Sequence, residues 1–170
     1  AGYMATKYLI DSGHRDICGI FKQDDMQGHS RYEGYMKALV EADIPIEEFR
    51  VIWYTTESQK SMLDTFKSLE LDDLRRQGTG YVIYNDQVAN KFIQKISEKD
   101  IQVPEDVSVV SFDNASIAKN GLVQLTTIAH PKKRLGIDAA NYLIQLINKE
   151  SSIIEKTFEP ELIIRQSVQL

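Results

Sequence analysis

The sequence predicts an α/β fold, a Rossmann-like parallel sheet with helices on both faces. Short apolar runs alternate along the chain with segments whose apolar residues recur every three or four positions, which is typical of parallel strands joined by helical crossovers. The segment 103–114 (VPEDVSVVSFDN) has the valine-rich centre expected of a strand buried on both faces. It stops at Asp113 and Asn114, and ligands of such sheets bind outside the carboxyl ends of the strands.

The first half of the chain contains three predicted helices and two predicted strands. The first helix stops before Gly13, because glycine is favoured just past a helix end. The third helix carries Met62, Leu63, Phe66 and Leu69 at spacings of three and four. In chain order the elements are the helix 4–12, the strand 17–21, the helix 31–42, the strand 50–54 and the helix 57–69.

The second half begins with a segment, 70–80 (ELDDLRRQGTG), that is polar and glycine-rich at its end. We interpret it as an exposed connection. Pro131 suits the first turn of the last helix. The elements that follow the connection are the strand 81–84, the helix 87–98, the strand 107–112, an irregular stretch at 114–126 with one helical turn, the helix from Pro131 to about 148, and the strand 161–166.

Length and composition fit a soluble globular protein, with either one domain or a domain and a fragment of a second. The chain has 170 residues, of which 42% are hydrophobic and 26% charged. No run approaches the ~20 apolar residues of a membrane span, so we expect no membrane association. The single cysteine, Cys18, fits a buried thiol and a cytoplasmic location. The net charge of −5 argues against nucleic-acid binding by this part itself.

Polar side chains follow the predicted parallel strands. A hydroxyl-rich ligand needs donors and acceptors that face one pocket, and charge-assisted hydrogen bonds are the strongest of these. Because strand ends meet solvent in any parallel sheet, a ligand site and a solvated edge both stay open on this observation, and Asp113 fits a turn cap as well as a contact. The strand-end residues are Lys22, Asp24, Asp25, Tyr54, Thr55, Asn85, Asp86, Asp113 and Asn114.

Signatures of enzymes and metal sites are missing from the sequence. It has no G-x-S-x-G, G-x-x-x-x-G-K-[ST], H-E-x-x-H or paired C-x-x-C motif. The three histidines, His14, His29 and His130, lack metal-ligand spacing. We therefore expect neither an enzyme nor a cofactor or metal site.

Six segments, in order along the chain, resemble one bacterial family. Together they look like the effector-binding domain of LacI/GalR-type transcriptional repressors. The segments are 13–17 (GHRDI), 31–35 (R-x-x-G-Y), 84–89 (YNDQVA), 103–114 (VPEDVSVVSFDN), 125–131 (LTTIAHP) and 160–167 (PELIIRQS). The segments 21–34 and 158–167 most resemble arabinose-responsive members, in which the sensor follows a winged-helix domain of the GntR type.

The resemblance implies a periplasmic-binding-protein-like fold of two lobes with a sugar in the cleft between them. This chain would be the C-terminal part, with the second lobe at about 15–130 and 160–170. The helices at about 2–12 and 131–148 would belong partly to the first lobe. The DNA-binding domain would lie upstream of Ala1, outside this chain, and would contact operator DNA in a homodimeric full-length protein.

The resemblance also implies ligand-binding positions. Arg31 matches an arginine that holds ligand hydroxyls or carbonyls, and Tyr54 falls where relatives place an aromatic ring. Asn85 matches the asparagine of an N-D-x-x-A motif, and Asp113 matches the aspartate after the buried strand. His130 stands where a polar side chain reaches the cleft.

Five further positions bear on the site that the resemblance implies. Lys22 and Asp24 are additional contacts expected in arabinose-type members. Asp86 is left out of the site, since a residue there more often caps its helix. Ser111 and Phe112 replace a more usual Gly-Tyr pair, which should keep the fold and alter the cleft wall.

The leading functional hypothesis is ligand sensing. A small sugar, with L-arabinose as a candidate, would close the cleft and shift the repressor away from its DNA-binding state. A solute-binding protein for transport shares the fold and is the alternative; an α/β enzyme is a third, without an identifiable base–nucleophile pair. With the first lobe missing, the last long helix should expose the apolar residues Leu135, Ala139, Leu143 and Leu146.

Overall fold

A single six-stranded sheet forms the centre of the computed structural model, which describes residues 1–68, 70–149 and 156–169. The strand order is β2-β1-β3-β4-β5-β6. All neighbouring strands pair in parallel except β5 and β6, which are antiparallel. The strands are β1 (Ile17–Lys22), β2 (Val51–Tyr54), β3 (Gly80–Ile83), β4 (Ser108–Phe112), β5 (Thr126–Ala129) and β6 (Glu161–Ile163).

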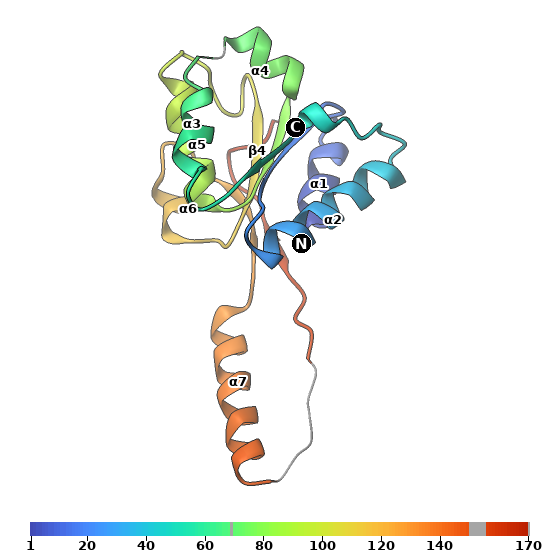
Figure 1. Cartoon of the computed structure of the whole chain (residues 1–170), viewed down its shortest axis with the longest axis vertical. Helices are drawn as coiled ribbons and strands as arrows, with labels where there is room; N and C mark the ends of the chain where they lie inside the picture. Colours follow the sequence, from blue (N-terminus) through green and yellow to red (C-terminus); the bar gives the residue numbers. More distant parts are fainter. Residues whose placement is uncertain (69, 150–155, 170) are drawn as a thin grey trace.

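Helices cover both faces of this sheet, as Figure 1 shows, so the predicted fold class is confirmed. Helices α1 and α2 lie on one face, and α3 to α6 lie on the other. Helix α7 extends away from the sheet. The helices are α1 (Gly2–Asp11), α2 (Met26–Glu41), the short 3₁₀ helix η1 (Glu48–Arg50), α3 (Gln59–Thr65), α4 (Leu71–Gln77), α5 (Asp86–Ser97), α6 (Ser116–Asn120) and α7 (Lys132–Ile147).

Alternate side chains of the central strands enter two separate cores. In β1, Ile17 and Phe21 pack under α1 and α2, whereas Cys18 and Ile20 pack under α3 to α6. Both faces of the sheet are therefore buried, as a parallel sheet between helix layers requires. Cys18 is a free, buried thiol whose pKa burial raises to about 12, so it is an unreactive core residue.

The segment 70–80 is not an exposed connection, because it contains α4. Leu74 on this helix is fully buried, and its carbonyl accepts a hydrogen bond of 2.9 Å from the Tyr81 hydroxyl. One buried leucine between charged residues gives no apolar stripe, so periodicity does not indicate this helix. Leu69, the predicted end of the preceding helix, lies outside the described residues.

Further boundaries differ from the prediction: α3 spans only Gln59–Thr65, and β6 ends at Ile163. Helix α2 begins at Met26 rather than Arg31, because the Asp25 side chain accepts a hydrogen bond of 2.7 Å from the Gln27 N–H and caps the helix. Strand β5 begins at Thr126, within a stretch predicted to be irregular. Thr126 and Thr127 are fully buried there, and their hydroxyls bond to distant partners rather than to neighbours in sequence.

Helix α7 exposes its apolar residues, as predicted. Leu135, Leu143 and Leu146 are 51, 60 and 49% exposed, and Ala139 is exposed as well. By contrast, α1 packs against α2 and contacts β3, β4 and β5. The assignment of both helices partly to another lobe stays a prediction. Within the described ranges, no helix has the length and apolar character needed to cross a membrane.

Candidate functional site

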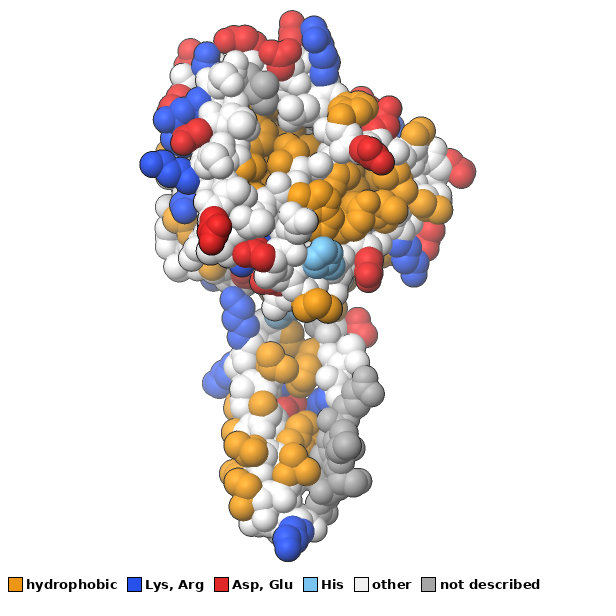
Figure 2. Space-filling view, in the orientation of Figure 1, with side chains coloured by type: hydrophobic (Ala, Val, Ile, Leu, Met, Phe, Trp, Pro, Cys, Tyr) orange, Lys and Arg blue, Asp and Glu red, His pale blue; other side chains and the backbone are white. Residues whose placement is uncertain are grey.

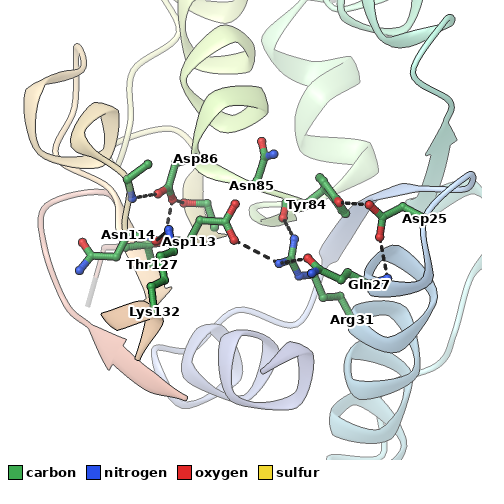
Figure 3. A network of polar contacts seen from close by, with 12 residues as sticks. Asp25, Gln27, Arg31, Tyr84, Asn85, Asp86, Asp113, Asn114, Thr127 and Lys132 are labelled. Atoms are coloured by element: carbon green, nitrogen blue, oxygen red, sulfur yellow. Dashed lines mark hydrogen bonds and ion pairs between the residues drawn. The ribbon is translucent and has the colours of Figure 1, made fainter. Parts of the chain in front are cut away.

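The site is built around Arg31, which α2 presents to the carboxyl ends of β3 and β4 (Figure 3). Its Nη1 donates to the Tyr84 carbonyl, and its Nη2 donates to Gln27 Oε1 at 3.0 Å and to Asp113 Oδ1 at 3.2 Å. The guanidinium carbon lies 4.7 Å from the centroid of the Tyr84 ring and 4.5 Å from that of Phe112. Two rings and three acceptors therefore hold this cation in one orientation.

Asp113 and Asn114 form a turn with an uncommon backbone. Their φ angles are +98° and +44°, in the left-handed region that residues other than glycine seldom adopt. Lys132 at the start of α7 donates to the Asp113 carbonyl at 2.7 Å. The Asp113 carboxylate pairs with Arg31. Because its side chain is 33% exposed, it is also accessible from outside the protein. Such strain is found where a fixed geometry has a use.

Three of the predicted ligand residues, Arg31, Asp113 and His130, line one cavity of about 670 Å³. Burial and the nearby Arg31 charge lower the pKa of His130, so its imidazole is neutral at pH 7 and offers one donor and one acceptor. The cavity therefore combines a cation, a carboxylate and a neutral ring. The other lining residues are Ala1, Gly2, Met26, Gln27, Ser30, Pro131, Lys132, Leu135, Lys156, Thr157 and Phe158.

Tyr54 and Asn85, two more predicted ligand residues, lie outside this lining. Tyr54 is 2% exposed in the core under α3 to α6, and its ring centroid lies 6.1 Å from that of Tyr84. Asn85 caps α5, because its Oδ1 accepts from the Val88 N–H at 2.9 Å. Ligand contact by either residue stays a prediction.

Lys22 and Asp24 sit further along the same edge of the sheet, also outside the cavity lining. Their charged groups are 3.7 Å apart. The Asp24 carboxylate accepts from the Thr56 N–H at 3.0 Å and from its hydroxyl at 2.8 Å. These two bonds lower the pKa of Asp24, so the carboxylate is ionised and ties the ends of β1 and β2 together. A ligand role for this pair also stays a prediction.

Asp86 does not cap its helix, since Asn85 is the cap. Its carboxylate is 1% exposed and accepts hydrogen bonds from Ser111 Oγ, Thr127 Oγ1 and the Ala115 N–H. Burial raises the pKa of Asp86. Sequence reasoning missed this cluster, because its members come from separate parts of the chain and no spacing connects them.

Ser111 and Phe112 lie behind the cavity wall rather than in it. Both are fully buried: Ser111 bonds to Asp86 at 2.6 Å, and Phe112 lies against the Arg31 guanidinium. Ser111 and Phe112, which stand in place of the more usual Gly-Tyr pair, therefore contact the residues that support the cavity wall and do not line the cavity themselves. Among the described residues, no three His, Cys, Asp or Glu side chains come together as a metal site would require.

Comparison with known proteins agrees with this fold. The model of the periplasmic binding protein-like domain matches residues 6–168. The chain belongs to this family. It is 41% identical over 180 residues to the arabinose metabolism transcriptional repressor of Halalkalibacterium halodurans, an alignment that covers 98% of this chain and 46% of that protein. It thus spans about half the length of this relative.

Solved structures of LacI-family regulators share the fold. The transcription regulator CcpA of Lactococcus lactis superposes with a TM-score of 0.84 at 31% identity, over 99% of this chain and 61% of that one. A LacI family transcriptional regulator from Enterococcus faecium with bound ribose gives 0.83 at 28% identity, over 99% of this chain and 62% of that one. The resemblance to LacI/GalR-type regulators is therefore confirmed.

Proposed function

We propose that this chain is the effector-sensing part of a bacterial transcriptional repressor and binds a small sugar at Arg31, Asp113 and His130. The observation that carries the proposal is the Arg31–Asp113 pair, whose charged groups lie 3.2 Å apart in the lining of the cavity. A sugar hydroxyl can donate to one member and accept from the other, and bonds to charged groups are the strong ones. Because partners already hold both groups in place, binding costs little of their side-chain conformational entropy.

L-arabinose is the first candidate ligand. The relative at 41% identity is named a repressor of arabinose metabolism, and a more distant regulator at 28% identity holds ribose, which is also a pentose. A cavity with a cation, a carboxylate and a neutral imidazole suits a compact polyol. The sugar would bind the closed state of the protein better than the open one and so shift the population between them.

The remainder of the function follows from the family. We infer that the chain is the second lobe of a cytoplasmic sensor, that α1 and α7 belong partly to the first lobe, and that operator DNA is contacted by a domain outside this chain. The complete protein would act as a homodimer without enzymatic activity. Gene regulation is favoured over solute transport, because the relatives compared above are transcription regulators.

Calorimetry on the complete protein that carries this chain tests the proposal. The panel is L-arabinose, D-ribose and cellobiose, and we expect saturable binding of L-arabinose with one site per chain. Arg31→Lys should weaken L-arabinose binding at least tenfold, because the lysine ammonium lacks the planar guanidinium that bonds to three acceptors. Arg75→Lys is the matched control, since Arg75 makes an exposed ion pair with Asp106 at 2.9 Å. No binding by any of the three sugars contradicts the proposal.

A further inference from the structure

A buried carboxylate lies directly behind the ligand-facing turn. Asp86 Oδ1 accepts from Ser111 Oγ at 2.6 Å and from Thr127 Oγ1 at 2.7 Å, and Oδ2 accepts from the Ala115 N–H at 2.7 Å (Figure 3). None of the ion pairs within the described ranges involves Asp86. Three donors, not a cation, therefore offset the cost of burying this group.

The same bonds fix the backbone of the turn from two directions. The Thr127 hydroxyl donates to Asp86 and accepts from the Asn114 N–H at 3.3 Å, which a hydroxyl can do at once. The Ala115 N–H bonds to Asp86 directly. Two successive amides after Asp113 are thus tied to one carboxylate, and Asp113 itself donates its N–H to the Ile128 carbonyl at 2.9 Å.

This anchoring matters, because aspartate and asparagine tolerate positive φ better than most residues but still adopt it at a cost in free energy. Two consecutive non-glycine residues with positive φ cost free energy and persist only when their surroundings hold them. A relaxed turn would move the Asp113 carboxylate away from Arg31. A displacement of about 1 Å is enough to spoil a positioned polar group.

We propose that Asp86 and Thr127 are positioning residues that hold the Asp113–Asn114 turn and thereby set effector affinity, without touching the effector. The proposal rests on the proposed function only for its last step, from the turn to the affinity. Neither Asp86 nor Thr127 lines the cavity. An amide in place of the Asp86 carboxylate would keep one acceptor oxygen and present an NH₂ group where an acceptor is needed.

Adjacent threonines of β5 provide a matched pair of variants. Thr127→Val removes the hydroxyl that links Asp86 to the turn. Thr126→Val removes an equally buried hydroxyl, which accepts from the Arg165 N–H at 3.0 Å and does not itself bond to Asp86 or to the turn. The Arg165 side chain donates to Asn114 Oδ1 at 2.6 Å, and its second bond, to the Leu125 carbonyl at 2.7 Å, holds it in place without Thr126. Thr127→Val loses two hydrogen bonds and Thr126→Val loses one, so we expect the first variant to lose somewhat more stability, and the comparison depends on affinity and exchange rather than on stability. Thr127→Ser restores the hydroxyl, and Asp86→Asn tests the carboxylate.

Two readouts are taken on the complete protein: L-arabinose affinity by calorimetry, and hydrogen–deuterium exchange of a peptide that covers residues 113–116. We expect Thr127→Val and Asp86→Asn to speed exchange and to weaken L-arabinose binding by roughly tenfold, since one displaced polar contact corresponds to about that factor. Thr126→Val should leave both readouts unchanged, and Thr127→Ser should restore them.

Equal effects of Thr126→Val and Thr127→Val on affinity and exchange would overturn the positioning role, as would unchanged exchange in Thr127→Val. If Asp86→Asn fails to fold, the two threonine variants decide. If the unaltered protein does not bind L-arabinose, the proposed ligand is wrong, and the exchange comparison still decides whether Asp86 and Thr127 hold the turn.

Discussion

Tyr84 links two charged side chains at the edge of the candidate site. Its hydroxyl donates to Asp25 Oδ2 at 2.7 Å, and its ring lies against the Arg31 guanidinium. Burial and the Asp25 bond raise the pKa of Tyr84 to about 12, and the same bond lowers the pKa of Asp25. At neutral pH the phenol is therefore a neutral donor to an ionised carboxylate, and α2 is tied at its N-cap to the end of β3.

Tyr84→Phe keeps the ring beside Arg31 and removes this bond. We expect it to lower the free energy of unfolding by about 1 kcal/mol at pH 7. The folded pKa of Asp25 lies below the ordinary 3.8, so the bond stabilises the fold above that pH and is lost as the pH falls through the folded value. The difference between Tyr84→Phe and the unaltered chain should shrink accordingly. Urea unfolding between pH 7 and pH 3 measures it.

Tyr81→Phe is the control for this pH dependence. The Tyr81 hydroxyl donates to the Leu74 carbonyl at 2.9 Å, and a carbonyl does not titrate in this range. Loss of the Tyr81–Leu74 hydrogen bond should lower the free energy of unfolding by a similar amount at every pH tested. A Tyr84→Phe difference as flat with pH as that of Tyr81→Phe would contradict the role assigned to Asp25.

At the scale of elements, a helix or strand could be predicted where its own residues show an apolar period or an apolar run. Helix α5 and strand β4 were predicted to within one residue of their observed bounds, because each has a clear apolar period or run. Helix α4 and strand β5 were missed. The first buries one leucine, and the second has two threonines among its four residues, with hydroxyls that bond across the fold. Long-range partners, which a single sequence does not display, decide such elements.

The same substitution on two helices tests the correction at α4. Leu74→Ala should lower the free energy of unfolding by about 2–4 kcal/mol, because Leu74 is fully buried and its removal leaves a cavity. Leu143→Ala on α7 should change it by less than about 0.5 kcal/mol, since Leu143 is 60% exposed. Urea unfolding of the 170-residue chain measures both. Equal losses would mean that α4 does not pack as described.

At the scale of the whole molecule, the sheet topology explains which part of the site was predictable. Asp113 and His130 follow β4 and β5, whose carboxyl ends meet at one edge, whereas Arg31 reaches the same cavity from α2 and was named through the family resemblance. The sheet topology does not determine the direction in which a side chain at a strand end points. Tyr54 turns into the core and the Asn85 oxygen is taken by a helix cap, because neighbours from elsewhere in the chain determine both.

The molecule also has an exposed apolar surface on α7. This helix extends away from the sheet and carries apolar side chains along its length (Figures 1 and 2). Soluble monomers seldom expose such a stripe, and water is released when two stripes cover each other. We therefore expect the 170-residue chain to associate as its concentration rises. The exposed apolar residues of α7 include Leu135, Ile137, Leu143, Ile144, Leu146 and Ile147.

Two paired substitutions isolate the contribution of α7 to this association. Leu143→Glu with Ile147→Glu places two charges one helical turn apart on α7 and should make the chain monomeric without changing its urea midpoint. Val40→Glu with Phe49→Glu adds the same charge at residues 61 and 59% exposed on other elements and should leave association intact. Sedimentation velocity over a hundredfold range of concentration measures the outcome. A monomeric unaltered chain, or equal effects of the two pairs, would show that the α7 stripe does not drive association.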